Sequence, residues 1–190
     1  MSRLHVLAQN PRRTLGALAT VLVAAGVTAA SGADFTATSA NPANTFSAGT
    51  LTIDNSKEGS AILTAANLRP GDPATVGTVD IENSGSLSGA FSLSRQPPAD
   101  SDSANPLSGK LNITVVDCGT FAAGTPVCGD GDDVTRVSGT TIGALSGPTA
   151  LGTYAAGEKH RYRFSVALDS SAGNAYQGDT STVRFDWNAA

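Results

Sequence analysis

The stretch HRYRFSVALD, residues 160–169, alternates regularly between two kinds of side chain. Every second residue from Tyr162 to Leu168 is apolar, and the residues between them are charged or small. Because successive side chains of a β-strand point to opposite faces, this period of two predicts a strand that is buried on one side only. The stretch therefore indicates a sheet that packs on a core.

The same alternation recurs along the chain, and no stretch after the first 33 residues shows helical periodicity. The C-terminus is a second clear case, since Val183, Phe185 and Trp187 alternate with polar residues. Weaker candidates are residues 61–63 and 140–145. Four more half-buried strands are indicated by Leu51 and Ile53, by Val79 and Ile81, by Phe91 and Leu93, and by Leu111, Ile113 and Val115.

Clusters of Gly, Pro, Asn, Asp and Ser separate these segments, at residues 69–72, 83–85, 96–98 and 146–148. Such residues supply the fixed or positive φ angles that tight turns need. Seven to eight strands at this spacing predict an all-β fold, an antiparallel β-sandwich. The longest polar stretch, residues 97–108, predicts a mobile surface loop.

The N-terminus has the layout of a secretory signal peptide. Its first thirteen residues carry Arg3, Arg12 and Arg13 and no acid, and residues 14–33 carry no charge. The uncharged stretch is rich in Ala, Thr and Gly, which suits an export signal better than a permanent membrane span. Residues 1–33 are therefore predicted to be a signal peptide, and the protein to be secreted.

Cleavage is expected between Ala33 and Asp34, after a triplet of small residues, and residues 28–30 offer an alternative site. Two further alternatives are a twin-arginine signal, which Arg12 and Arg13 resemble in part, and an uncleaved membrane anchor, because twenty uncharged residues approach the length of a transmembrane helix. Export implies a signal peptidase as processing partner. After cleavage we expect no membrane attachment, and a location in the extracellular matrix or at the cell surface.

The exported part, residues 34–190, is acidic: nine Lys and Arg stand against sixteen Asp and Glu. Nucleic acids and anionic membrane surfaces are recognised by basic patches, so neither is expected as a partner. The exported part is one domain in length. A chain of this size buries enough surface to form a core without relying on disulfides.

The chain has two cysteines, Cys118 and Cys128, both in the exported part. An even number of cysteines in an oxidising compartment predicts a disulfide. The bridge would close a loop of about ten residues and stabilise the fold by about 2–3 kcal/mol in the chain-entropy model. A redox role would favour a closer C-x-x-C spacing, and a zinc site would need more ligands.

Catalytic groupings are sparse. His160 is the one histidine of the exported part, whereas an H-E-x-x-H zinc site needs two on one helix face. Because His160 stands beside Arg161 at the head of a strand, we expect it to be a solvated surface side chain. The G-x-S-x-G pattern of serine hydrolases is not found, since Leu occupies the middle position of 85–89 and of 143–147. No cofactor is expected.

The acidic cluster Asp130, Asp132 and Asp133 follows the second cysteine. Carboxylates on a loop are ligands that Ca²⁺ prefers, so the cluster is a weak candidate metal site. Counted from Asp130, the position where a calcium loop carries a bidentate Glu is occupied by Thr141. The favoured interpretation is a solvated turn that the disulfide holds.

Several short motifs are spread over most of the exported chain, and together they resemble the TasA/camelysin family of exported bacterial proteins. This family's signals are typically cut by a SipW-type signal peptidase. The motifs are ADFTA (33–37), NPANTFSAGTL (41–51), LRPGD (68–72), GTV (77–79), IENSG (81–85), YAAGE (154–158), YRF (162–164), NAYQG (174–178) and FDWNA (185–189).

The resemblance implies a jelly-roll-like sandwich that polymerises into the fibres of a biofilm matrix, each subunit lending its N-terminal strand to a neighbour. The corresponding domains are the signal peptide, residues 1–33, an extended donor segment, residues 34–48, and the sandwich, residues 49–190. A polar, extended segment suits addition to a sheet edge. The alternative is an ordinary first strand of its own domain. The residues expected to mediate assembly are Asp34, Phe35, Thr36, Ala37 and Phe46.

Two other functions stay open. Camelysins have been described as casein-cleaving metallopeptidases, so the resemblance also carries an enzyme hypothesis, which would have to rest on carboxylates because zinc ligands are scarce. A monomeric adhesin is the second alternative, since β-sandwiches host many binding functions. We expect a homo-oligomer or filament.

Overall fold

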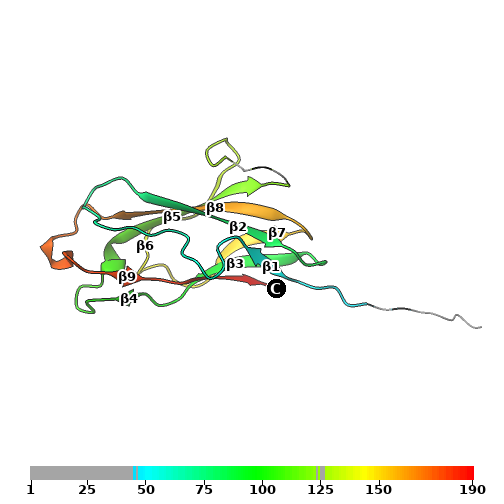
Figure 1. Ribbon diagram of the computed structural model, residues 1–190, viewed down its shortest axis with the longest axis horizontal. Helices are drawn as coiled ribbons and strands as arrows, with labels where there is room; N and C mark the ends of the chain where they lie inside the picture. The colour runs from blue at the N-terminus through cyan, green and yellow to red at the C-terminus, as the bar shows by residue number, and fades with distance from the viewer. Residues whose placement is uncertain (1–44, 46, 123, 125–126) are drawn as a thin grey trace, which may run out of the picture. The chain divides into compact units, whose positions relative to one another are not determined.

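The computed structural model describes residues 45, 47–122, 124 and 127–190, and the domain from Ser47 to Ala190 is built almost entirely of β-strands (Figure 1). The alternating stretch around Tyr162 forms β8, Lys159–Leu168, in which every second residue from His160 onward is buried. The strand predicted at residues 160–169 is therefore confirmed, and the residues predicted to share one face are the buried ones.

The described part of the chain contains nine further strands besides β8, and several of them match the predicted segments. The strands are β1 (Ile53–Asn55), β2 (Thr75–Asn83), β3 (Gly89–Arg95), β4 (Ala99–Asp100), β5 (Leu111–Thr120), β6 (Val134–Thr141), β7 (Thr149–Tyr154), β9 (Ser181–Thr182) and β10 (Phe185–Ala189). Two short 3₁₀ helices, η1 (Leu107–Lys110) and η2 (Asn174–Tyr176), complete the set.

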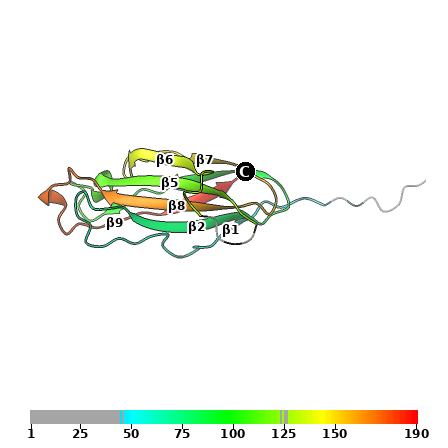
Figure 2. The same cartoon turned by 90° about the horizontal axis from the view of Figure 1, so that it is seen from above.

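The strands form an antiparallel sandwich, as expected. One sheet has the order β1-β2-β8-β5-β6, which can be followed in Figure 2, and the second has the order β10-β3-β7. Neighbouring strands of the described part of the chain pair antiparallel, and β4 pairs with β9 as a small third sheet. The eight strands of the two larger sheets agree with the predicted seven to eight.

The core lies between the two sheets. The five-stranded sheet contributes fully buried Ile81, Val115 and Phe164, and the three-stranded sheet contributes Phe91 and Leu151. Burying a large apolar side chain stabilises a fold by about 1.5–3 kcal/mol, so this layer supplies much of the driving force. Aromatic rings also contact one another across the sheets, in the pairs Phe164 with Phe185 and Tyr162 with Trp187.

Some strand predictions were wrong in detail. Residues 61–63 form no strand, and β6 ends at Thr141 before a turn that covers most of the predicted strand 140–145. The strand β7 was missed because its sequence, TALGTY, has no clean alternation. Residues 97–108 are mostly a loop, as predicted, but they contain β4, which pairs with β9, and Asp100, which accepts hydrogen bonds from Ser108.

One glycine of β2 is required by a close approach. A Cβ atom on Gly77 would lie 2.3 Å from the carbonyl oxygen of Ile62 and 2.7 Å from the Cβ of Leu63. The segment before β2 therefore crosses directly over this strand, which it could not do over a larger residue. This crossing fixes one wall of the groove described below.

Candidate functional site

A cluster of charged side chains lies in the interior at one end of the sandwich, around His160. Its ring Nδ1 lies 2.9 Å from Oδ1 of Asp117, and its Nε2 lies 3.0 Å from Oε1 of Glu158. His160 is 9% exposed and Asp117 is 1% exposed. An ionised carboxylate only accepts hydrogen bonds, so a ring held between two of them donates from both nitrogens and is an imidazolium.

A bulge in β5 brings Asp117 to this position. Asp117 stands opposite Tyr162, whereas Thr120 stands opposite His160, so β5 contains one extra residue here. Gly119 adopts the positive φ of +84° within the bulge, and its N–H donates to Oδ1 of Asp117 at 3.1 Å. Bulges re-aim the side chains of a strand, and this one lets a carboxylate reach the ring on the neighbouring strand.

Asp117 also binds one group from β6 and a second group from β8. Arg136 of β6 donates from Nη2 to Oδ2 of Asp117 at 2.9 Å, and the hydroxyl of Tyr162 donates to the same oxygen at 3.4 Å. The hydroxyls of Tyr154 and Tyr162 are hydrogen-bonded to each other. The ring of Tyr154 stacks on His160 with centroids 4.2 Å apart. The carboxylate is thus the common acceptor of a buried network.

Glu158 closes the network at the turn between β7 and β8. Its second carboxylate oxygen accepts the N–H of Ala155 at 2.6 Å, which fixes the turn. The buried Asn83 lies at the same end and donates from Nδ2 to the carbonyl oxygens of Leu87 and Tyr154. The β2–β3 turn and the β7–β8 turn, each of which connects the two sheets, are therefore tied together by side chains.

The titration behaviour of the cluster follows from this geometry. Burial alone would lower the pKa of His160, but the hydrogen bonds to Asp117 and Glu158 outweigh it, so the pKa is raised. Burial alone would raise the pKa of Asp117, but His160 and Arg136 outweigh it, so this pKa is lowered. Burial strongly raises the pKa of Tyr162. At pH 6, below the raised pKa of His160 and above the lowered pKa of Asp117, the cluster therefore contains an ionised aspartate, a charged histidine and a neutral tyrosine.

The expectation that His160 is a solvated surface residue is wrong. Arg161 does point to the outer face, where it binds Asp80 in a bidentate pair at 2.6 and 2.8 Å. His160 points inward, in phase with Tyr162, and both of its nitrogens are occupied. A doubly donating ring has no lone pair to offer a metal or a serine, so in this state it acts as neither ligand nor base.

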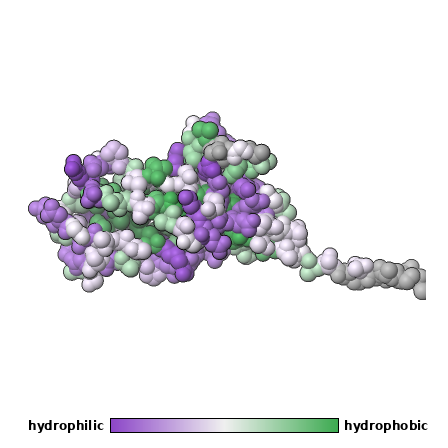
Figure 3. Space-filling model, viewed as in Figure 1, coloured by the Kyte–Doolittle hydropathy of each residue, from purple (hydrophilic) through white to green (hydrophobic). Residues whose placement is uncertain are grey.

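A second feature is a groove along one side of the sandwich. It has a volume of about 1540 Å³ and lies between the β9–β10 segment and the irregular residues 60–70. Small-molecule pockets are typically about 300–1,000 Å³, so this groove has room for a longer, chain-like ligand. Figure 3 shows apolar atoms gathered along the middle of the visible face, between hydrophilic rims. Apolar lining residues include Leu68, Leu111, Phe164, Val166, Phe185 and Trp187.

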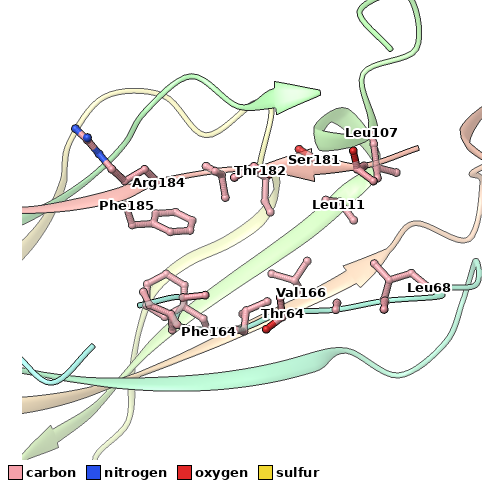
Figure 4. A pocket seen from close by; sticks show the side chains of 18 of the residues that line it. Thr64, Leu68, Leu107, Leu111, Phe164, Val166, Ser181, Thr182, Arg184 and Phe185 are labelled. Carbon is pink, nitrogen blue, oxygen red and sulfur yellow. The ribbon is translucent and has the colours of Figure 1, made fainter. Parts of the chain in front are cut away.

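The groove exists because a three-stranded sheet covers a five-stranded one incompletely. On one side the edge strands β6 and β7 contact each other. On the other side, Phe185 of β10 faces Phe164 and Val166 of β8 across the groove, while Arg184 points away from it (Figure 4). Both Phe185 and Trp187 are only partly buried. An added apolar segment would therefore remove further surface from water.

The strand β10 also has an open edge. It pairs with β3 alone among the described strands. Ala190 and Ala90 exchange both backbone hydrogen bonds, and the carbonyl of Arg184 accepts from Gln96 on the same side. Because alternate residues of a strand direct their backbone groups to opposite sides, those of Phe185 and Trp187 point toward the open edge. Such an edge is a template for another strand.

The acidic cluster is brought together as the sequence suggested. One carboxylate oxygen from each of Asp130, Asp132 and Asp133 lies within 4.8 Å of the others. A hydrogen bond between Asp130 and Asp132 lowers the pKa of the first and raises that of the second. Asp133 also pairs with Arg163, whose charge at 3.6 Å would oppose a cation. The cluster stays a weak candidate metal site, and the favoured interpretation is still a solvated turn.

The expected disulfide is confirmed. Cys118 and Cys128 are bonded, with their Cα atoms 4.7 Å apart. Cys118 is buried at the end of β5, directly after the carboxylate of Asp117. The bridge therefore anchors the loop after β5 to the bulged part of the strand.

The predicted export and assembly residues lie outside the described residues. These are Ala33 and Asp34 at the expected cleavage site, and Phe35, Thr36, Ala37 and Phe46 of the donor segment. In the part of the chain that the structure describes, no helix is long and apolar enough to cross a membrane.

Comparison with known proteins leaves the identity open: no protein-family model and no curated protein matches this chain. The functional argument therefore rests on the residues and their geometry.

Proposed function

We propose that the protein is a secreted structural subunit that self-associates into extracellular fibres or a surface coat. The observation that carries the proposal is the groove: a sandwich with an apolar channel and an open edge strand beside it. The export-type N-terminus and the resemblance to the TasA/camelysin family support the same function.

The occupant that we propose is residues 34–48 of a second copy. The segment is polar and extended in pattern, with Phe35 and Phe46 as isolated large apolar side chains. At about 3.3 Å per residue it would span about 50 Å, whereas the groove wall from Ser181 to Asn188 spans about 26 Å. The segment is long enough to fill the groove and still connect two subunits.

Strand addition at β10 would supply both affinity and selectivity. Backbone groups of Phe185 and Trp187 would pair with the incoming strand, and alternate side chains of that strand would face the apolar floor formed by Phe164 and Val166. Removal of residues 1–33 would create the free N-terminus of the donor. Because the donor would become available only after this cleavage, subunits would stay apart until they have been exported.

The test compares assembly of residues 34–190 with assembly of residues 49–190 by electron microscopy, after intact-mass analysis has confirmed the N-terminus of the secreted form. Truncation should abolish filaments and leave a folded domain. Filaments of the truncated chain equal to those of the longer one would contradict strand donation.

A matched pair of variants tests the groove. Thr64 is exposed and lines the groove (Figure 4), whereas Thr78 is exposed on the strand β2 and does not line it. Thr64→Arg should block assembly because the incoming strand would have to desolvate a charge, and Thr78→Arg should assemble normally. Equal assembly of both variants would show that the groove is not the acceptor.

The peptidase alternative gains nothing from the geometry. The one histidine of the exported part is enclosed by two carboxylates, and it is not among the residues that line the groove. We therefore keep the structural role as the proposed function.

A further inference from the structure

The buried charge cluster is not used by the proposed assembly, and it has an unusual composition. His160 is enclosed by groups from every element packed against it: Asp117 of β5, Glu158 of the preceding turn, Tyr154 of β7 and Tyr162 of β8. Arg136 of β6 reaches the cluster through Asp117. A single proton on the ring therefore decides whether β8 is held by charge to β5 and to the β7–β8 turn.

The neighbours of His160 on the outer face do not share this environment. Lys159 pairs with Glu82, and Arg161 pairs with Asp80, both across the β2–β8 ladder. Ile81, the residue opposite His160 in that ladder, is apolar and fully buried. The two carboxylates and Arg136 are thus the charged groups to which the ring proton responds.

Without that proton the cluster is mismatched. A neutral ring keeps one N–H, so one of its nitrogens would present a lone pair to a carboxylate lone pair, at Asp117 or at Glu158. The contact concerned, 2.9 or 3.0 Å long, would change from a hydrogen bond to a repulsion. A 180° flip of the ring would not restore the hydrogen bonds, because it would place ring carbons against Asp117 and Glu158 in place of the two nitrogens.

We propose that protonation of His160 controls the stability of this end of the sandwich. The imidazolium form binds β5 and the β7–β8 turn to the interior of the sandwich, and loss of the ring proton releases them. This control by the ring proton of His160 is independent of whether the protein forms fibres.

The direction of the effect follows from the raised pKa of His160. The charged ring stabilises the folded state fully below 6.5, the ordinary pKa of a histidine, and this stabilisation is lost as the pH rises through the raised pKa of the folded state. The lowered pKa values of Asp117 and Glu158 act in the opposite direction, so their contribution is lost in acid. This end of the sandwich is therefore held together in mildly acidic solution and released as the pH rises through the raised pKa of His160.

The change should also reach β10. Tyr162 hydrogen-bonds to Asp117, and its ring contacts Trp187 with centroids 5.0 Å apart. Trp187 is the one tryptophan of the chain, so its fluorescence reports on this end of the sandwich.

The exported chain is well suited to a direct test, because residues 34–190 contain one histidine and one tryptophan. We would titrate this chain from pH 5 to 10 and follow the ring nitrogens of His160 by ¹⁵N NMR and the emission of Trp187. Both ring nitrogens should be protonated at pH 6. Both signals should change together, with a midpoint above 6.5. The ratio of folded to unfolded protein should fall tenfold for each unit by which the folded-state pKa exceeds the unfolded one.

Two variants distinguish control by the ring proton of His160 from the behaviour of an ordinary buried histidine. His160→Gln should remove the change of Trp187 emission with pH. Glu158→Gln should keep this change but shift its midpoint to lower pH, because one carboxylate charge is lost. A neutral ring in the wild-type protein at pH 6 would overturn the proposal, even if His160→Gln failed to fold. An unchanged Trp187 titration in a folded His160→Gln variant would also overturn it.

Discussion

Replacing Asp117 by Ala should cost far more stability than replacing an ion-paired aspartate on the outer face of the same sheet. The Asp117 side chain is 2% exposed, and its carboxylate accepts hydrogen bonds from His160, Arg136 and the N–H of Gly119. Its removal leaves two charged groups without their acceptor. Breaking a buried ion pair on one side typically costs about 3–5 kcal/mol, so we expect a loss in this range.

The matched control is Asp80→Ala. Asp80 binds Arg161 with good geometry, but the two side chains are 22% and 17% exposed, and water can replace the lost partner. We expect a loss of about 1 kcal/mol or less. Urea unfolding of residues 34–190 measures both, and the midpoint of Asp117→Ala should fall by at least about 1 M for an m value of about 1–3 kcal/mol/M. Equal losses in the free energy of unfolding of the two variants would contradict the claim that the burial of Asp117 makes its ion pairs costly to break.

Two further predictions concern the framework. Changing Cys118 and Cys128 together to Ala should cost about 2–3 kcal/mol, and reduction of the wild-type protein should give the same loss in urea unfolding, whereas no effect of reduction would mean that the bridge adds nothing. Gly77→Ala should cost about 1–3 kcal/mol because its Cβ would meet Ile62 and Leu63, while Gly109→Ala, with nothing within 4 Å of its Cβ, should be nearly neutral; equal thermal stability of the two variants would contradict the close crossing.

Alternation along the chain was sufficient to predict the sandwich. The strands β2, β3, β5, β8 and β10 each contain the apolar residues that the sequence placed on one face. In β2, β3 and β8 the buried residues lie on the inner face only, which is the case that a period of two reports. The strand β7 was missed because its pairing with β3 is broken by a register shift and its Gly152 has a positive φ.

The charge cluster could have been found by extending two alternations. Ile113 and Val115 face inward, and the next residue in phase is Asp117. Tyr162 also faces inward, and the residue in phase before it is His160. The prediction gave more weight to the neighbouring Arg161 than to this phase. The bulge that joins Asp117 to His160 has no sequence signal beyond Gly119, because register between strands is a tertiary property.

The groove could not be predicted from the sequence. It depends on two sheets of unequal width and on the irregular path of residues 60–70, which no periodicity describes. The sequence did suggest a polar, extended donor segment, residues 34–48. The structure adds an open edge at β10 and an apolar channel beside it, and the proposal that joins the two comes from their complementary chemistry.

The account is tested most directly by electron microscopy of wild-type residues 34–190, imaged over several days at neutral pH and compared with the surface of cells that secrete the protein. It predicts filaments of uniform width, in the purified sample and on the cells. A protein that stays strictly monomeric under all conditions, with no filaments on cells, would contradict it.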